Sequence, residues 1–163
     1  MALADNWKFS FQLFGGWSFV HSGTFNSVED FWGGMKHIPK PSQLLTSLEG
    51  PREAFLGEEN ENVRGICLSR SPVVLEWKYP GMNFIFEIET ENLPGHDMDA
   101  QYEDYCSHIV TEQYPSLLGF RLLDRSKKGT PVKHRWEFWC SEKDEKLKAL
   151  TDKKNGIVKE INS

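Results

Sequence analysis

Cysteine is scarce in this sequence, and the three that it has fit no metal-binding or redox motif. Cys67, Cys106 and Cys140 are far apart and odd in number, which favours free thiols in a reducing compartment. No apolar run approaches the roughly 18 residues of a membrane span, and the N-terminus lacks the basic and apolar blocks of a signal peptide. We therefore expect a cytoplasmic or nucleocytoplasmic protein that makes no contact with membranes.

An excess of positive charge is absent as well. The chain carries 24 acidic and 19 basic residues, which gives a formal net charge of −5. Because non-specific binding to a nucleic-acid backbone needs many Lys and Arg residues, any nucleotide site here must be local. The sequence also lacks clustered carboxylates for catalytic metal ions and any Ser/His/Asp or Cys/His arrangement. We expect no enzyme activity, no metal and no cofactor.

Aromatic residues, by contrast, are abundant, with six Trp, eleven Phe and four Tyr among 163 residues. A chain of this length fits one domain, which buries roughly 68–70% of its unfolded surface. Six Trp exceed what a core alone usually needs, so some indoles are expected on the surface, where they can stack on a ligand. We predict a single domain over residues 1–163. The stretch 49–65, rich in Glu, Asn and Gly, is predicted to be a mobile insertion.

Hydrophobic periodicity predicts strands that alternate with single helices. Strands are predicted at residues 7–13, 17–25, 83–89, 117–124, 132–140 and 157–161. Helices are predicted at residues 27–38, 97–113 and 141–154, with Ser27 and Ser141 as N-caps. The strands are linked mainly by hairpins, so the predicted class is α+β, an antiparallel sheet backed by about three helices.

The segment from Gly16 to Trp32 carries the most specific motif. It contains Gly-Trp-Ser-Phe-Val and, after a predicted strand, Val-Glu-Asp-Phe-Trp. This stretch resembles the one by which the eukaryotic translation initiation factor 4E family is known, whose members bind the 7-methylguanosine cap of mRNA. The resemblance extends from Trp7 to Ile161. It implies a curved sheet with the cap-binding pocket on its concave face.

Two tryptophans match the family's cap-stacking pair. The resemblance assigns these roles to Trp17 and to Trp77, and a methylated guanine suits such a pair because its π-system is positively charged. In the family, a glutamate after the second tryptophan reads the guanine edge. Here Lys78 stands in that position and has no acceptor. Glu76 is the candidate for the base edge; alternatively Glu76 is merely solvated, or backbone carbonyls read the guanine.

The stretch from Arg125 to Trp139 resembles the family's phosphate-binding hairpin. Arg125 and Arg135 match its phosphate-binding pair, while Lys128 and Lys133 add charge to the same hairpin. Charge-assisted Arg contacts are what a triphosphate bridge requires. Trp139 matches the indole that packs near the N7-methyl group. The competing interpretation is an ordinary solvated hairpin.

The resemblance also implies a surface for a protein partner, a helix from initiation factor 4G or from a 4E-binding protein. Val28 and Trp32 match the family's docking residues on the first helix. On the second helix, Asp104 matches an acidic docking residue, but the family's leucines are replaced by Glu103 and Ser107. Losing apolar anchors costs on the order of 1–3 kcal/mol each, so partner preference is expected to differ. The alternative for Trp32 is a buried packing residue.

These residues lead to one hypothesis and one alternative. The hypothesis is a protein that binds capped mRNA and recruits a partner to initiate or regulate translation, without catalysis. The alternative is a translational repressor or an interaction scaffold whose cap pocket is weakened or altered, and Lys78 is its best argument.

Overall fold

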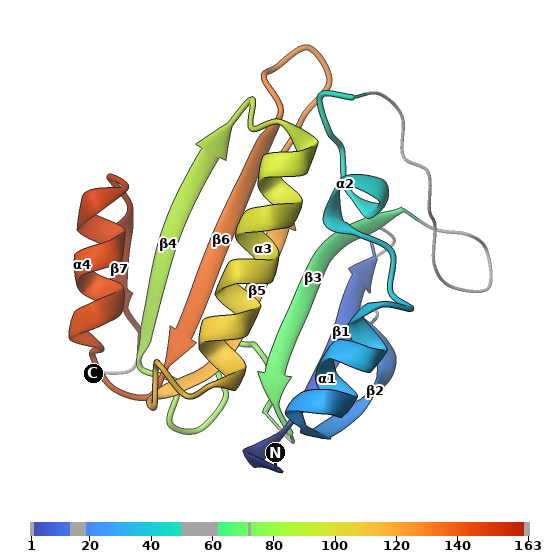
Figure 1. Cartoon of the computed structure of the whole chain (residues 1–163). Coiled ribbons are helices and arrows are strands. Elements are labelled where there is room, and N and C mark those ends of the chain that lie inside the picture. The colour runs from blue at the N-terminus through green and yellow to red at the C-terminus, as the bar shows by residue number, and fades with distance from the viewer. Residues whose placement is uncertain (1, 14–18, 50–61, 72, 162–163) are drawn as a thin grey trace.

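The computed structural model describes the backbone of residues 2–13, 19–49, 62–71 and 73–161, and the side chains of these residues except 2–5 and 19–22. Within these residues, seven strands form one sheet in the order β2-β1-β3-β5-β6-β4-β7, and every adjacent pair is antiparallel. The sheet curves, and the helices lie on one side of it (Figure 1). The predicted α+β class is confirmed.

The predicted strands and helices are found in the predicted order, with bounds close to the predicted ones. The strands are β1 (Ala2–Leu13), β2 (Phe19–Ser27), β3 (Val63–Arg70), β4 (Phe84–Glu91), β5 (Leu117–Asp124), β6 (Lys133–Cys140) and β7 (Ile157–Glu160). The helices are α1 (Val28–Met35), α2 (Pro41–Leu44), α3 (Gly95–Val110) and α4 (Glu145–Lys153).

Two of these elements were not predicted from the sequence. The predicted loop before residue 65 includes the start of β3. This strand lies inside the sheet, between β1 and β5, and is buried on both faces, so its sequence has no clear alternation. The single turn α2 is too short to show a helical period. Residues 50–61 lie outside the described part of the chain, so the mobile insertion stays a prediction.

Helix ends depend on capping atoms, and here one N-cap is confirmed and one is wrong. The Ser27 side chain accepts a hydrogen bond from the backbone N–H of Asp30, as expected at the start of α1. Helix α1 ends earlier than predicted, at Met35. At α4 the cap is Asp144, whose carboxylate accepts from Leu147 N, whereas Ser141 precedes the helix and donates to Ser116 O.

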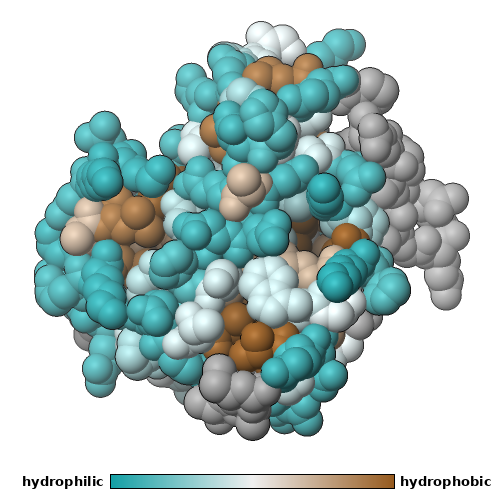
Figure 2. All heavy atoms as spheres, in the orientation of Figure 1, coloured by the Kyte–Doolittle hydropathy of each residue, from teal (hydrophilic) through white to brown (hydrophobic). Residues whose placement is uncertain are grey.

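An aromatic core fills the space between the helices and the sheet. Tyr105 of α3 lies 5.2–5.9 Å from the rings of Phe120, Trp136 and Phe138 on β5 and β6, in edge-to-face contacts. The apolar stripe of α3 is buried against the sheet and contains Met98, Tyr102, Tyr105, Ile109 and Val110. On the outer surface of this side, hydrophilic side chains surround small apolar patches (Figure 2). No helix in the described ranges is long and apolar enough to cross a bilayer.

The two possible caps of α4 make a direct test of the helix boundary. Replacing Asp144 by Ala removes the acceptor for Leu147 N and is expected to lower the free energy of unfolding by about 1 kcal/mol. Ser141→Ala removes only a 3.3 Å contact to Ser116 and should cost less. Urea unfolding of both variants measures the difference. An equal or larger loss in Ser141→Ala would contradict the assigned cap.

Candidate functional site

The sheet presents two different faces because side chains alternate along each strand. Along β6, Trp136 and Phe138 belong to the core under the helices, whereas Arg135, Glu137 and Trp139 point to the other side. We call this second side the open face, since within the described residues all four helices lie on the opposite side (Figure 1). Arg135 and Trp139 therefore share the open face.

One end of the open face is apolar. Trp139 is only 2% exposed and belongs to a second, smaller hydrophobic cluster. Its buried members are Cys67, Val73, Leu75, Met82, Ile85 and Trp139. Three of them come from the segment 73–82 that joins β3 to β4, so this segment covers the indole. It packs closely on β5, where a Cβ at Gly119 would clash with Leu75. Beside the cluster is a pocket of about 150 Å³, with Ser10 and Ser69 in its lining.

The same segment carries the predicted base-binding residues. Trp77 is 60% exposed and stands in a tight turn, in which Tyr79 N donates to the Glu76 carbonyl at 3.1 Å. The side chains of Glu76 and Lys78 on either side of it are exposed too. The position after the tryptophan therefore presents a cation to the solvent. Trp17, the other predicted stacking residue, lies outside the described residues.

A row of charged and polar side chains crosses the middle of the open face; we call it the charged belt. Its members are Gln12, Arg121, Glu137, Arg135, Glu87 and Lys159. Arg121 Nε donates to Glu137 Oε1 at 2.7 Å, and Arg135 Nε donates to Glu137 Oε2 at 2.8 Å. Glu87 is 2.8 Å from Lys159 Nζ and 3.8 Å from Arg135 Nε. The belt thus connects five of the seven strands.

Burial and charge act against each other on Glu137. Its side chain is 3% exposed, and burial by itself raises the pKa of the carboxyl. The guanidinium of Arg121, aided by Arg135 and by the N–H of Trp139, outweighs burial and leaves the Glu137 pKa below its ordinary value. Both carboxylate oxygens therefore accept hydrogen bonds in the ionised state.

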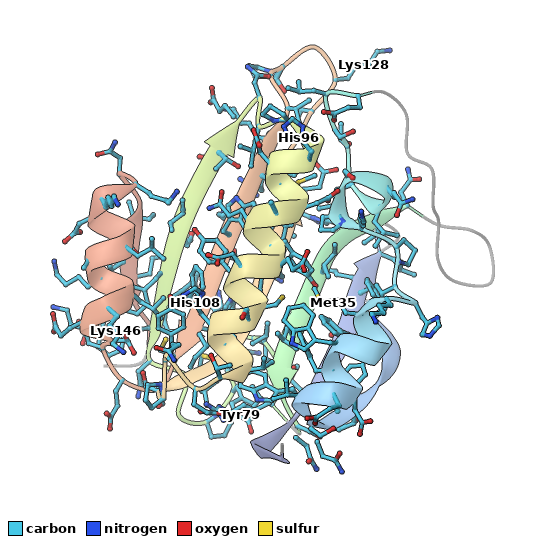
Figure 3. The ribbon with its side chains drawn as sticks, in the orientation of Figure 1. Met35, Tyr79, His96, His108, Lys128 and Lys146 are labelled. Carbon is cyan, nitrogen blue, oxygen red and sulfur yellow. The ribbon has the colours of Figure 1, made fainter. Side chains whose placement is uncertain are left out.

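The opposite end of the open face is basic and exposed. Arg125 and Lys128 belong to the turn between β5 and β6, and Lys133 Nζ lies 3.2 Å from Glu91 Oε1. Figure 3 shows Lys128 at one end of the sheet and Tyr79, from the 73–82 segment, at the other. Arg125, Lys128 and Lys133 are therefore separated from Glu76 and Trp77 by the charged belt, to which the fourth predicted phosphate residue, Arg135, belongs.

Sequence reasoning missed the belt itself. Arg121 sits in the apolar run Leu117–Asp124, and Glu137 lies between two aromatic residues, so neither is part of a recognisable motif. A signal was present in the alternation of charged residues with Trp136 and Phe138, which puts Arg135 and Glu137 on the same face. The partner of Glu137 on the neighbouring strand could not be predicted, because it depends on the register of β5 and β6, which places Arg121 opposite Glu137.

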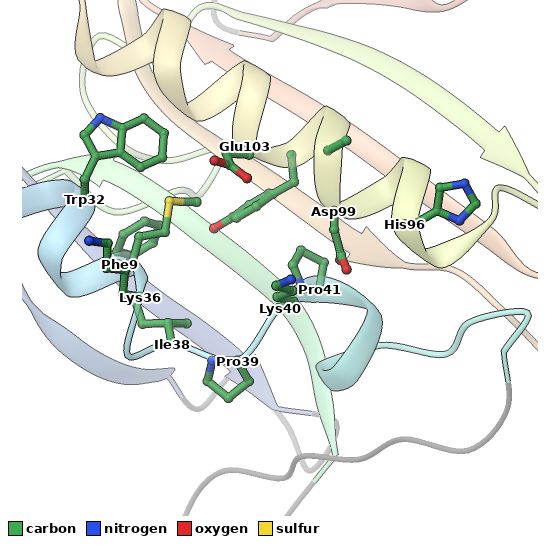
Figure 4. Close-up of a pocket in the computed structure, with 13 residues that line it drawn as sticks. Phe9, Trp32, Lys36, Ile38, Pro39, Lys40, Pro41, His96, Asp99 and Glu103 are labelled. Atoms are coloured by element: carbon green, nitrogen blue, oxygen red, sulfur yellow. The ribbon is translucent and has the colours of Figure 1, made fainter.

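A groove lies on the helix side, between α1 and α3. It measures about 470 Å³ and has an apolar floor with charged residues at its rim. Its lining includes Phe9, Trp32, Met35, Ile38, Tyr102 and Glu103. Trp32 from α1 and Glu103 from α3 stand on opposite walls (Figure 4). Of the predicted partner residues, Trp32 lines this groove. Val28 is half-buried at the start of α1, and Asp104 is exposed beside His108.

Metal binding has no support in the described part of the chain, where no group of three or more His, Cys, Asp or Glu side chains is placed to hold an ion. The three cysteines are free and buried. Burial raises the pKa of the Cys67 thiol to about 11, so this residue of the open face is not a reactive thiolate at neutral pH.

Comparison with family models and with curated proteins found no match to this sequence. Solved structures do match. A Schistosome eIF4E complexed with m7GpppG and 4E-BP is 16% identical with a TM-score of 0.65, over 93% of this chain and 78% of that chain. Ascaris suum eIF4E-3 with an m2,2,7G cap is 14% identical with a TM-score of 0.68, over 93% and 79%. The same protein with an m7G cap is 15% identical with a TM-score of 0.67. The chain therefore has the fold of the eIF4E proteins.

Acid titration tests the electrostatics of the charged belt. The folded pKa of Glu137 is lowered, so its charge stabilises the fold above the ordinary pKa near 4.5, and this contribution is lost as pH falls through the folded value. Glu137→Gln should lower the free energy of unfolding by roughly 3 kcal/mol at pH 7, because Arg121 loses its buried counter-ion.

The difference between wild type and Glu137→Gln should shrink as the pH falls below 4.5, because the unfolded wild type then takes up a proton on Glu137 that the folded wild type binds only at lower pH. Urea unfolding at pH 7 and at pH 3.5 to 3 measures it, with the exposed Glu89→Gln on β4 as control. A difference that stays constant with pH would contradict the lowered pKa.

Proposed function

We propose that this protein binds the 7-methylguanosine cap of mRNA on the open face and holds it without turnover. The observation that carries the proposal is the order of groups along this face. An apolar end with an exposed indole is followed by the charged belt and then by a basic turn. A cap has the same order, a cationic aromatic base followed by a chain of phosphates. Proteins of this fold have been solved with m7G caps.

The base is proposed to stack on Trp77, with Trp17 on its other side. Trp77 is 60% exposed, which is unusual for an indole and leaves its ring accessible to a ligand. A methylated guanine gains both stacking and cation–π energy, roughly 1–3 kcal/mol per indole. We propose that Glu76 accepts from the guanine edge in place of the missing glutamate, since Lys78 has no acceptor. Trp139 reaches the methyl group only when the 73–82 segment shifts, because it is 2% exposed.

The phosphates are proposed to lie along the outer half of β6. Arg135 is 23% exposed and contacts Glu137 through Nε alone. Its two terminal amines have no hydrogen-bond partner among the described residues, so they can donate a bidentate pair of hydrogen bonds to phosphate oxygens. Arg125, Lys128 and Lys133 extend the positive charge beyond it. We propose the cytoplasm as the setting for this binding.

The second part of the proposal is recruitment of a partner helix to the groove between α1 and α3. The groove is lined largely by apolar residues, which suits the apolar face of an amphipathic helix. One structure of the same fold was solved with 4E-BP. We propose Trp32 as the central contact, with Val28 and Asp104 at the edge of the interface. Glu103 on the α3 wall would favour a partner that carries a basic residue there.

A second candidate function is an interaction scaffold or translational repressor with a weakened cap pocket. Three observations favour it: Lys78 replaces the guanine-reading residue, Trp139 is covered, and Arg135 is ion-paired in the free protein. The groove on the helix side needs none of these residues. The cap titration below separates the two candidates, since only the first predicts saturable binding.

Tryptophan fluorescence measures cap binding directly. Titration with 7-methyl-GTP should give saturable quenching, and GTP should give much less, because only the methylated base is cationic. Trp77→Ala and Trp17→Ala should each raise Kd by about tenfold or more. Trp32→Ala, on the helix side, is the matched control and should leave Kd unchanged. No quenching of the folded wild type would refute cap binding and favour the scaffold.

The partner surface has its own test. A labelled peptide with the pattern Tyr-x-x-x-x-Leu-Φ should bind, with a change in fluorescence anisotropy. Trp32→Ala should raise its Kd by about thirtyfold, as expected when a central aromatic contact is lost. Trp77→Ala serves as the control from the open face. Equal binding to wild type and Trp32→Ala would show that the groove is not the docking site of this peptide.

A further inference from the structure

We propose that Glu137 is a positioning residue of the cap site, which aims Arg135 at the phosphates and fixes Trp139 at the base end. This inference rests on the proposed function, and it assigns a role to a residue that makes no contact with the cap itself. It is carried by the hydrogen bonds of one buried carboxylate. The side chain is 3% exposed, and three donors converge on it.

The two oxygens of Glu137 accept hydrogen bonds from different residues. Oε2 accepts from Arg135 Nε at 2.8 Å. Oε1 accepts from Arg121 Nε at 2.7 Å and from the Trp139 indole N–H at 3.1 Å. The carboxylate therefore ties together a proposed phosphate ligand and the proposed methyl-site indole, which lie four residues apart on β6. No other described carboxylate touches both.

The contact to Arg135 is of the kind that aims a guanidinium. Because the anchor is Nε, the planar group is fixed at its inner edge, and its outer edge with two amines faces away from Glu137. An arginine held in this way loses less freedom when it binds a phosphate than one that must first be ordered. Glu87 lies farther from the same Nε, at 3.8 Å, which is beyond hydrogen-bond distance.

Arg121 keeps Glu137 from cancelling the charge of Arg135. Its guanidinium is buried beside Glu137 and is held in turn by Gln12 Oε1, which accepts from Nη1 at 3.0 Å. The negative charge of Glu137 is thus compensated from the interior. Arg135, at the exposed side of the belt, remains available to an anion. Arg121 also lies 5.4 Å from the centre of the Trp139 ring and so packs against the second group that Glu137 holds.

A positioning role and a simple charge effect predict opposite signs. If Glu137 were only a negative charge near the phosphates, its neutralisation would strengthen binding to a triphosphate. If it aims Arg135, neutralisation lets the guanidinium turn away and weakens that binding. Glu87 is the matched control, since it is a buried carboxylate of the same belt whose shorter contact is to Lys159 and which does not touch Trp139.

The experiment compares 7-methyl-GTP with 7-methyl-GMP as ligands of the same protein by tryptophan fluorescence. The ratio of the two Kd values reports the contribution of the outer phosphates, and a general loss of stability does not change it. Glu137→Gln should lower the preference for the triphosphate about tenfold. Glu87→Gln should leave the preference unchanged or increase it. Arg135→Lys, which leaves the buried pair of Arg121 and Glu137 intact, should lower it as Glu137→Gln does, because lysine has no second donor edge.

The outcomes are distinguishable. A preference in Glu137→Gln that stays at or above that of the wild type would overturn the positioning role while leaving cap binding in place. If Glu137→Gln does not fold, Arg135→Lys decides, and a wild-type preference in that variant has the same meaning. Absence of 7-methyl-GTP binding by the folded wild type would refute the proposed function, and the positioning role with it.

Discussion

The alternation of side chains across one antiparallel sheet is the constraint on which this molecule depends. On β6, Trp136 and Phe138 pack under α3, and the residues between them, Arg135 and Glu137, face the other way. A slip of one residue in the pairing of β5 with β6 would bury charges under the helix and expose the aromatic core. The same register brings Arg121 opposite Glu137. The core and the charged belt are thus two results of one pairing.

Burying the charges of the belt costs desolvation free energy. A buried ion pair loses hydration that its Coulomb energy barely recovers, and apolar residues of similar volume are often as stable or more so. Here two guanidiniums and two carboxylates gather on a face that the described helices leave uncovered. Such an arrangement contributes little to stability and agrees with the proposed binding of an anionic ligand on this face. The ionised state of Glu137 agrees with its place between two guanidinium groups.

The open face and the groove are separate surfaces that share strand β1. Phe9 contributes to the floor of the groove, while its neighbours Lys8 and Ser10 line the small pocket of the open face. A ligand on one face and a partner on the other would therefore contact adjacent residues of the same strand. The two proposed activities remain chemically independent, because one uses aromatic and cationic groups and the other an apolar groove with an acidic wall.

The sequence by itself determined the class of fold, most element positions and the local chemistry of the motifs. Periodicity placed β1, β5, α3 and the N-cap Ser27, since these depend on neighbours along the chain. It did not find β3, which is buried on both faces, nor the true cap of α4.

The charged belt and the groove were decided only by the tertiary structure. They bring together residues such as Gln12 and Arg121, or Trp32 and Glu103, whose proximity follows from strand register and helix packing and leaves no periodic trace in the sequence. Burial was also decided there. The family resemblance assigns both Trp77 and Trp139 to the cap site. Trp77 is exposed and Trp139 is covered, because the 73–82 segment folds back over the sheet.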